Sequence, residues 1–371
     1  MKKCTLVIGL LCLFLYACNN NGKQAVVKEE SKPILTIDQV NESWQTATIN
    51  GVESSNVLEL VKAFQKQWPT KSVAALLEDL KLPEDQQQYI SVNDQEHAYV
   101  SFAEGSDDAD AESMQAHVWQ RSNGHQLFGV TFSQPSAKVK SFVAFYDYDP
   151  AQKSLVPETS LANLYTPSFS NVSITYDLPQ EGNNLVVTEY FFNWWMALRH
   201  VYDWDGMKPW DPVTDFAGVE MIMDEFNENY MTYEMGDFTK YALIDIDEDG
   251  EPEIWISTQD EEYQAVLSVV EENAKIIAGK DYKRQLIFYK GVVGDAGGCG
   301  TGCFYAHYTK LKNSAVEYEF GDMQSYNFET DDMDDEFSKD EEILTQEEGQ
   351  AILESFGEPY DPEVTWRPLL Q

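Results

Sequence analysis

The sequence feature that most limits the fold is a series of short segments with a period of two between residues 91 and 192. This period is typical of strands that bury one face. The strongest local signal is Asn123-Gly124, which separates two apolar segments and is typical of a tight hairpin turn. Further strands are expected at Phe142–Tyr148, Val172–Tyr176 and Leu185–Phe191. The pattern predicts an antiparallel sheet with one face packed against a core.

The segments on either side of these hairpins have other patterns. Residues 33–90 are mainly helical, because apolar residues up to Phe64 recur at helical spacing before Trp68-Pro69 ends the run. After residue 241 strand patterns return. Near the end, Thr345 and Glu348 form a capping box that predicts a short last helix.

Together these patterns predict an α+β, β-rich chain: a short helical N-terminal part, an antiparallel hairpin domain, and a second β-meander domain. The expected divisions are 1–17, 18–32, 33–192 and 193–371, and residues 193–240 are expected to connect the two halves. The stretch Val266–Ile277 also fits a helix. Its β-branched residues favour a hairpin that turns at Glu272 and Asn273.

The first residues have the pattern of an export signal. Lys2 and Lys3 precede an apolar run, Leu6–Leu15, that is too short to span a bilayer. The run ends in Leu15-Tyr16-Ala17-Cys18, which resembles the lipobox of bacterial lipoproteins. The resemblance implies cleavage of residues 1–17 before Cys18, acylation of this cysteine and a membrane anchor made of lipid. An ordinary cleaved signal peptide and a signal anchor are the alternatives.

The same resemblance predicts a location. Residues 18–32 are polar and are expected to act as a tether between the lipid and the first folded part. Asn19 follows the cysteine where an aspartate would indicate retention in the inner membrane, so the outer membrane of the cell envelope is expected. The periplasmic and surface sides remain alternatives. Over most of its length the chain also resembles uncharacterised lipoproteins, a likeness that implies no activity.

The charge of the chain limits its partners. The 64 acidic and 25 basic residues leave a net charge of −39, and removal of residues 1–17 with their two lysines would leave −41. Such a surface repels nucleic acid and anionic lipid headgroups and attracts cations. Binding to DNA or RNA is therefore not expected, and the predicted lipid is the one expected contact with a membrane.

Two cysteines remain after the predicted processing, Cys299 and Cys303, in a glycine-rich segment. In an oxidising compartment a disulfide between them is the main interpretation. A disulfide that closes so short a loop reduces the conformational entropy of the unfolded chain only modestly. A redox pair and a metal site that also uses His307 are the alternatives, although the spacing matches no common zinc pattern.

One acidic segment has the spacing of a calcium loop. Carboxylates at alternate positions converge on one cation when the chain turns sharply, and glycine at Gly250 permits that turn. The expected ligands are the side chains of three aspartates, the main-chain carbonyl of one glutamate and the carboxylate of another. They are Asp245, Asp247, Asp249, Glu251 and Glu253.

This segment resembles the D-x-D-x-D-G-x-x-[DE] loops of FG-GAP repeats and dockerins. It differs from a full EF-hand because Ile256 stands where the twelfth-position glutamate would be. Apolar segments on both sides predict strand–loop–strand, and the second β-meander domain is thus expected to carry a calcium loop. A solvated acidic turn without specific binding is the alternative.

The sequence predicts no particular enzyme. It contains no G-x-S-x-G, H-E-x-x-H, P-loop or dinucleotide motif. A hydrolase that uses two carboxylates is a minor hypothesis, because 64 acids place pairs somewhere by chance. The main hypothesis is a non-catalytic envelope scaffold or binding protein with a structural calcium site. The alternative is a glycan- or peptide-binding surface module that uses exposed tryptophans, namely Trp194, Trp195, Trp204 or Trp210.

Overall fold

The computed structural model describes residues 32–87, 89–105, 111–134, 140–170, 172–191, 196–204, 210–223, 237–270, 273–313, 315–327 and 330–370. The expected signal peptide, Cys18 and the expected tether up to residue 31 lie outside these ranges. Contacts divide the chain into two units, Met1–Pro33 and Ile34–Gln371. Within the described ranges, no helix is both long and apolar enough to cross a membrane.

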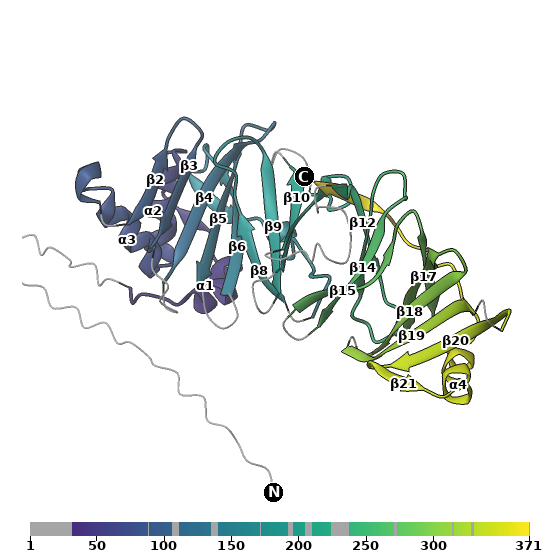
Figure 1. The fold of residues 1–371 in the computed structure, drawn as a ribbon. Coiled ribbons are helices and arrows are strands. Elements are labelled where there is room, and N and C mark those ends of the chain that lie inside the picture. Colours follow the sequence, from purple (N-terminus) through teal and green to yellow (C-terminus); the bar gives the residue numbers. More distant parts are fainter. Residues whose placement is uncertain are drawn as a thin grey trace, which may run out of the picture. The chain divides into compact units, whose positions relative to one another are not determined.

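The N-terminal part of the larger unit packs three helices on a seven-stranded antiparallel sheet (Figure 1). The helices are α1 (Ile37–Ser43), α2 (Val57–Gln67) and α3 (Lys71–Asp79). Asn56 begins α2 because its side chain accepts a hydrogen bond from the main-chain nitrogen of Leu58. Phe64 of α2 is fully buried and packs with Phe128 and Tyr146 of the sheet, so the apolar face of the helix closes this core.

The seven strands follow the order β1-β7-β6-β5-β4-β3-β2. Their bounds are β1 (Ile49–Asn50), β2 (Ile90–Asp94), β3 (Tyr99–Ala103), β4 (Ser113–Gln120), β5 (Gln126–Gln134), β6 (Lys140–Asp149) and β7 (Ser154–Pro157). The predicted turn at Asn123-Gly124 joins β4 to β5, and Gly124 has a φ of 83°, which glycine adopts without steric cost. Short 3-10 turns lie at Trp44–Thr46, Glu84–Gln86 and Thr159–Leu161.

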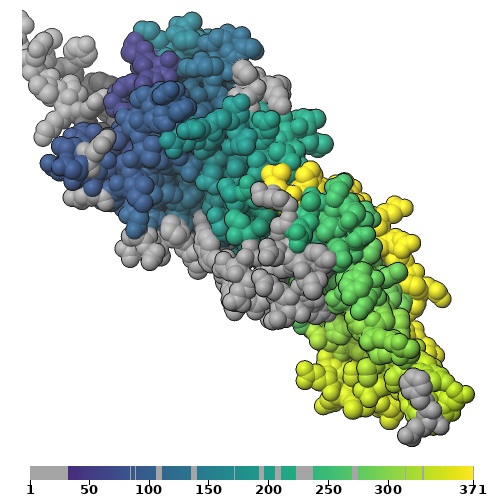
Figure 2. Space-filling view, turned by 45° about the horizontal axis from the view of Figure 1, so that its top comes forward, coloured from purple at the N-terminus to yellow at the C-terminus, as the bar shows by residue number. Residues whose placement is uncertain are grey.

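A nine-stranded sheet follows, in the order β15-β14-β13-β12-β22-β11-β10-β9-β8. The bounds are β8 (Val172–Asp177), β9 (Asn184–Phe191), β10 (Met196–Asp203), β11 (Phe216–Met223), β12 (Lys240–Ile244), β13 (Glu253–Ser257), β14 (Gln264–Val270), β15 (Asn273–Lys280) and β22 (Arg367–Leu370). The C-terminal strand β22 runs parallel to β11 and antiparallel to β12. Figure 2 shows the yellow C-terminal residues between the teal and green parts of the surface.

This sheet changes the expected role of residues 193–240. They were expected to connect two halves, but they contain β10 and β11, which are central strands of the sheet. β9 pairs with β10 from Asn184 opposite Asp203 to Tyr190 opposite Ala197. The expected division at residue 192 thus falls between two paired strands. The alternation of apolar and polar residues that is typical of strands is difficult to recognise in this segment, because it contains many Trp, Met and acidic residues.

The last part is a meander of six strands in sequence order. They are β16 (Arg284–Tyr289), β17 (Val292–Gly300), β18 (Cys303–Lys312), β19 (Ala315–Asn327), β20 (Asp332–Lys339) and β21 (Glu342–Leu344), and α4 (Gln346–Phe356) follows. The predicted capping box is present, with Thr345 and Glu348 each bonded to the other's main-chain nitrogen. Phe356 of α4 packs in the core of this sheet, against Tyr308 and Phe320.

The structure confirms the predicted fold class: a β-rich α+β chain with a small helical part and antiparallel hairpins. Of the ambiguous stretch Val266–Ile277, residues 266–270 lie in β14 and residues 273–277 in the antiparallel β15. Asn273, expected in the turn, instead pairs with Val270, and Glu272 lies outside the described residues. The helical alternative is therefore wrong. β-branched side chains pack well on a pleated surface, and this favours the strand.

Candidate metal centre

The acidic loop joins two adjacent strands of the nine-stranded sheet. β12 and β13 pair antiparallel, and the last pair before the loop is Ile244 opposite Glu253. Ile244 and Ile254 are buried and anchor both ends of the loop in apolar cores. The predicted strand–loop–strand arrangement is thus present.

Three of the five expected ligands lie together. Among the described residues, the group of acidic, histidine or cysteine side chains that could hold a metal ion consists of Asp245, Asp247 and Asp249. One carboxylate oxygen from each lies within 4.8 Å of the others. Asp247 is half-buried and the other two are exposed. Carboxylate oxygens are the ligands that calcium prefers, at about 2.3–2.6 Å from the ion.

Hydrogen bonds within the loop hold two of these carboxylates in place. The side chain of Asp245 accepts hydrogen bonds from the main-chain nitrogens of Asp249 (3.1 Å) and Gly250 (3.0 Å). The side chain of Asp249 accepts one from the nitrogen of Glu251 at 2.8 Å. Gly250 has a φ of 93°, so the tight turn depends on glycine at this position, as the sequence predicts.

The two glutamates have other positions. Glu251 was expected to contribute its main-chain carbonyl. Its side chain accepts hydrogen bonds from the main-chain nitrogen of Ser170, at 3.2 and 3.0 Å, and so links the loop to the segment before β8. Glu253 was expected as a further carboxylate ligand. It is 1% exposed and lies outside the three-aspartate group, where it accepts a hydrogen bond from the nitrogen of Ile246 at 3.0 Å.

Burial and negative charge both act on Glu253. The pKa of its carboxyl is raised to about 8, mainly by burial and in smaller part by the negative charges of Asp247 and Asp245. The hydrogen bond from Ile246 acts in the opposite direction. Glu253 therefore lies within the electrostatic field of the aspartates.

The other residues singled out in the sequence have different environments. Cys299 and Cys303 lie at disulfide distance, with their Cα atoms 5.1 Å apart, at the turn between β17 and β18, and the disulfide between them stays a prediction. Of the tryptophans proposed as an exposed platform, Trp194 and Trp195 lie outside the described residues. For Trp204 the expectation is wrong, because it is 1% exposed and packs 5.8 Å from the rings of both Trp119 and Phe145. Trp210 is partly buried, with its ring 5.2 Å from that of Trp204.

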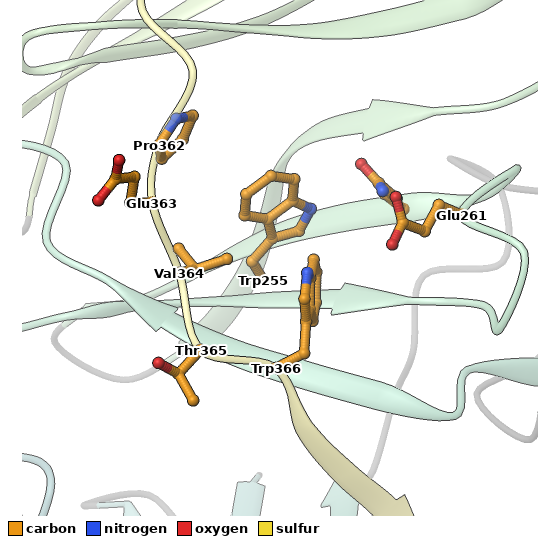
Figure 3. Close-up of a pocket in the computed structure, with 8 residues that line it drawn as sticks. Trp255, Glu261, Pro362, Glu363, Val364, Thr365 and Trp366 are labelled. Atoms are coloured by element: carbon orange, nitrogen blue, oxygen red, sulfur yellow. The ribbon is translucent and has the colours of Figure 1, made fainter.

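A pocket that the sequence did not indicate lies near the other end of β13. It has a volume of about 570 Å³ and is lined by residues of β13, of the following turn, of β14 and of the segment before β22 (Figure 3). The lining residues are Trp255, Glu261, Gln264, Pro362, Glu363, Val364, Thr365 and Trp366. Because about 100 residues separate its two walls, no local sequence signal could have identified it.

No protein-family model matches this chain, and no curated protein matches it. Among solved structures, a chain from a study of two prolyl endopeptidases is similar over 71% of this chain and 42% of its own length. The sequence identity is 10% and the TM-score is 0.20. This chain thus spans less than half of that structure, and a likeness with so low a TM-score carries no argument about fold or activity.

Proposed function

We propose that this protein is a lipid-anchored, non-catalytic binding protein or scaffold of the cell envelope, and that calcium bound at the acidic loop stabilises its nine-stranded sheet. The observation that carries the calcium site is the convergence of three carboxylates, from Asp245, Asp247 and Asp249, within 4.8 Å of one another. Three like charges so close repel one another, and a divalent cation between them replaces that repulsion with attraction.

The place of the loop supports a structural role for the ion. The loop closes the β12–β13 hairpin. The side chain of Glu251 links the loop to Ser170, which precedes β8, the edge strand of the same sheet. A cation that orders residues 245–251 would therefore hold two parts of the sheet that are distant in sequence. Outside the cytoplasm, calcium at millimolar concentration would fill a site with a Kd of about 10⁻⁴–10⁻³ M.

The calcium proposal is tested by titration calorimetry of the full chain with CaCl₂. The variant Asp247→Asn keeps the shape of the side chain and removes its charge, and is expected to bind calcium at least tenfold more weakly. The exposed Asp361→Asn removes one charge elsewhere and serves as the matched control. If Asp247→Asn gives the isotherm of the unchanged protein, the aspartates are a solvated acidic turn.

The lipid anchor rests on the Leu15–Cys18 pattern and has its own test. Mass spectrometry of protein extracted from membranes is expected to find Cys18 as the first residue, carrying acyl chains. Cys18→Ala is expected to move the protein from the membrane fraction to the soluble fraction, while Cys299→Ala, a cysteine of the folded part, leaves it at the membrane. A first residue other than Cys18, or a membrane-bound Cys18→Ala variant, would contradict the anchor.

A further inference from the structure

Apolar side chains stand on two sides of the pocket beside β13, while most of its exposed lining surface is polar. The ring centroids of Trp255 and Trp366 lie 5.0 Å apart with their planes tilted by 59°, so the two indoles form a wedge. The extended segment before β22 forms the facing wall. Pro362, Val364 and Trp366 are half-buried, and Figure 3 shows Val364 and Trp366 on the side of Trp255. Its volume of about 570 Å³ lies in the range of small-molecule sites.

The polar groups of the pocket come from the β13–β14 side. Glu261 lies in the turn after β13, and Gln264, which is 6% exposed, begins β14. Glu363 and Thr365 are exposed, and in Figure 3 their side chains point away from Trp255, as alternation along an extended segment requires. The groups available to a ligand inside the pocket are therefore one carboxylate, one amide and the indole N–H groups.

Trp255 carries the observation that points to a ligand. The residue is 9% exposed, and among the described residues its buried indole nitrogen Nε1 has no hydrogen-bond partner. Figure 3 shows this nitrogen on the edge of the ring that faces Glu261, across the pocket. A buried N–H donor is costly unless it finds an acceptor, so a pocket-filling ligand with an acceptor oxygen at this point gains a hydrogen bond that the protein alone does not make.

The charges around the pocket favour a neutral ligand. The ammonium group of Lys240 forms an ion pair with Glu261 at 2.5 Å and lies 4.9 Å from the centroid of the Trp366 ring. A cationic ligand would meet this resident cation at the ring it would bind. An anionic ligand would meet the Glu261 carboxylate and a chain of net charge −39.

We propose that this pocket binds a neutral sugar ring of a glycan. A pyranose presents apolar C–H faces that pack on indole rings, and hydroxyl groups that both donate and accept hydrogen bonds. One hydroxyl oxygen accepts the hydrogen bond from Trp255 Nε1, and other hydroxyls donate to Glu261 and Gln264. A proline-rich peptide also packs on aromatic rings and offers carbonyl acceptors, but proline has no N–H to donate to these two side chains.

This inference goes beyond the proposed function and does not rest on the calcium site. Its test uses the full chain with Cys18→Ala, which prevents the predicted acylation and leaves the folded unit unchanged. The indole N–H signals are followed by NMR with ¹⁵N-labelled tryptophan during titration with maltotriose, cellotriose, N-acetylchitotriose and decaproline, each to about 10 mM, ten times a Kd of 1 mM. All titrations are repeated in EDTA, so that a failure of the calcium site is seen separately.

At least one trisaccharide is expected to shift the Trp255 signal, which is assigned by its loss in Trp255→Phe. This variant keeps an aromatic ring, removes the N–H, and is expected to weaken binding about threefold to tenfold. Trp119→Phe is the matched control, because Trp119 also has a buried indole N–H without a described partner but lies in a different core. It is expected to leave the affinity unchanged.

Three results would overturn the proposal. The first is that no trisaccharide shifts the Trp255 signal. The second is that decaproline shifts it and the sugars do not, which would assign the pocket to a peptide. The third is that Trp255→Phe and Trp119→Phe bind the sugar equally well, because the orphan N–H would then not contact the ligand.

Discussion

Replacement of Asp247 by asparagine is expected to stabilise the protein when calcium is absent and to remove stability that calcium adds when it is present. Without calcium, the change removes two of the three like-charge pairs in the aspartate group, whose oxygens lie within 4.8 Å. Two unit charges at that distance repel by about 0.9 kcal/mol in water, and salt at 0.15 M reduces this by roughly half. Asp247→Asn is therefore expected to raise the free energy of unfolding by about 1 kcal/mol in EDTA.

With calcium the order changes. A site with a Kd of about 10⁻³–10⁻⁴ M adds about 1.4–2.7 kcal/mol to the free energy of unfolding of the unchanged protein at about 10 mM calcium. If Asp247→Asn loses calcium binding completely, it loses the whole gain and becomes less stable than the unchanged protein by roughly 0.4–1.7 kcal/mol; if binding weakens only tenfold, it loses about 1.0–1.3 kcal/mol and the two proteins become about equally stable.

The assay is urea unfolding followed by tryptophan fluorescence, in EDTA and in calcium at constant ionic strength, with Asp361→Asn as the control. Asp361 is exposed, and its replacement by asparagine removes one negative charge outside the loop. Asp361→Asn is expected to show the full calcium gain. Equal calcium gains in all three proteins, or a loss of stability for Asp247→Asn in EDTA, would refute the reasoning.

Other consequences concern the rest of the fold. Burial lowers the pKa of His117 to about 4, so the unfolded chain binds a proton that the folded chain excludes, and stability falls as the pH decreases from 6.5 to about 4. The raised pKa of Glu253 acts in the opposite direction over this range, but it does so in both proteins. The difference in free energy of unfolding between the unchanged protein and His117→Gln, measured by urea unfolding in EDTA, is therefore expected to fall by about 3 kcal/mol as the pH decreases from 6.5 to about 4. Serine at both Cys299 and Cys303 is expected to lower the free energy of unfolding by at most about 2 kcal/mol, because the closed loop is short; a larger loss in thermal unfolding would contradict this. Thr345→Ala removes the acceptor for the Glu348 N–H and is expected to lower the free energy of unfolding by about 1 kcal/mol. Thr345→Ser keeps a hydroxyl acceptor and is expected to retain most of that stability in the same assay.

Where the determining interactions are local, the sequence alone was sufficient. The hairpin at Asn123-Gly124, the last helix with its Thr345 cap and the turn at Gly250 each depend on residues within a few positions of one another. Their backbone preferences and side-chain caps act in the same way in any fold that contains them. The three aspartates of the acidic loop converge for the same reason.

Tertiary structure alone decided the features that join distant segments. The spacing of the acidic loop predicts Glu253 as a further carboxylate ligand. Packing of β13 in the sheet buries this side chain outside the aspartate group. The acidic sequence around Trp204 suggests an exposed side chain, yet this tryptophan packs with Trp119 in a core. The pocket beside Trp255 exists because β22 inserts between β11 and β12 and brings the residues before it across the sheet. Spacing along the chain sets which residues are able to converge, whereas burial and long-range strand pairing decide which of them meet, because those terms depend on contacts made by the whole folded unit.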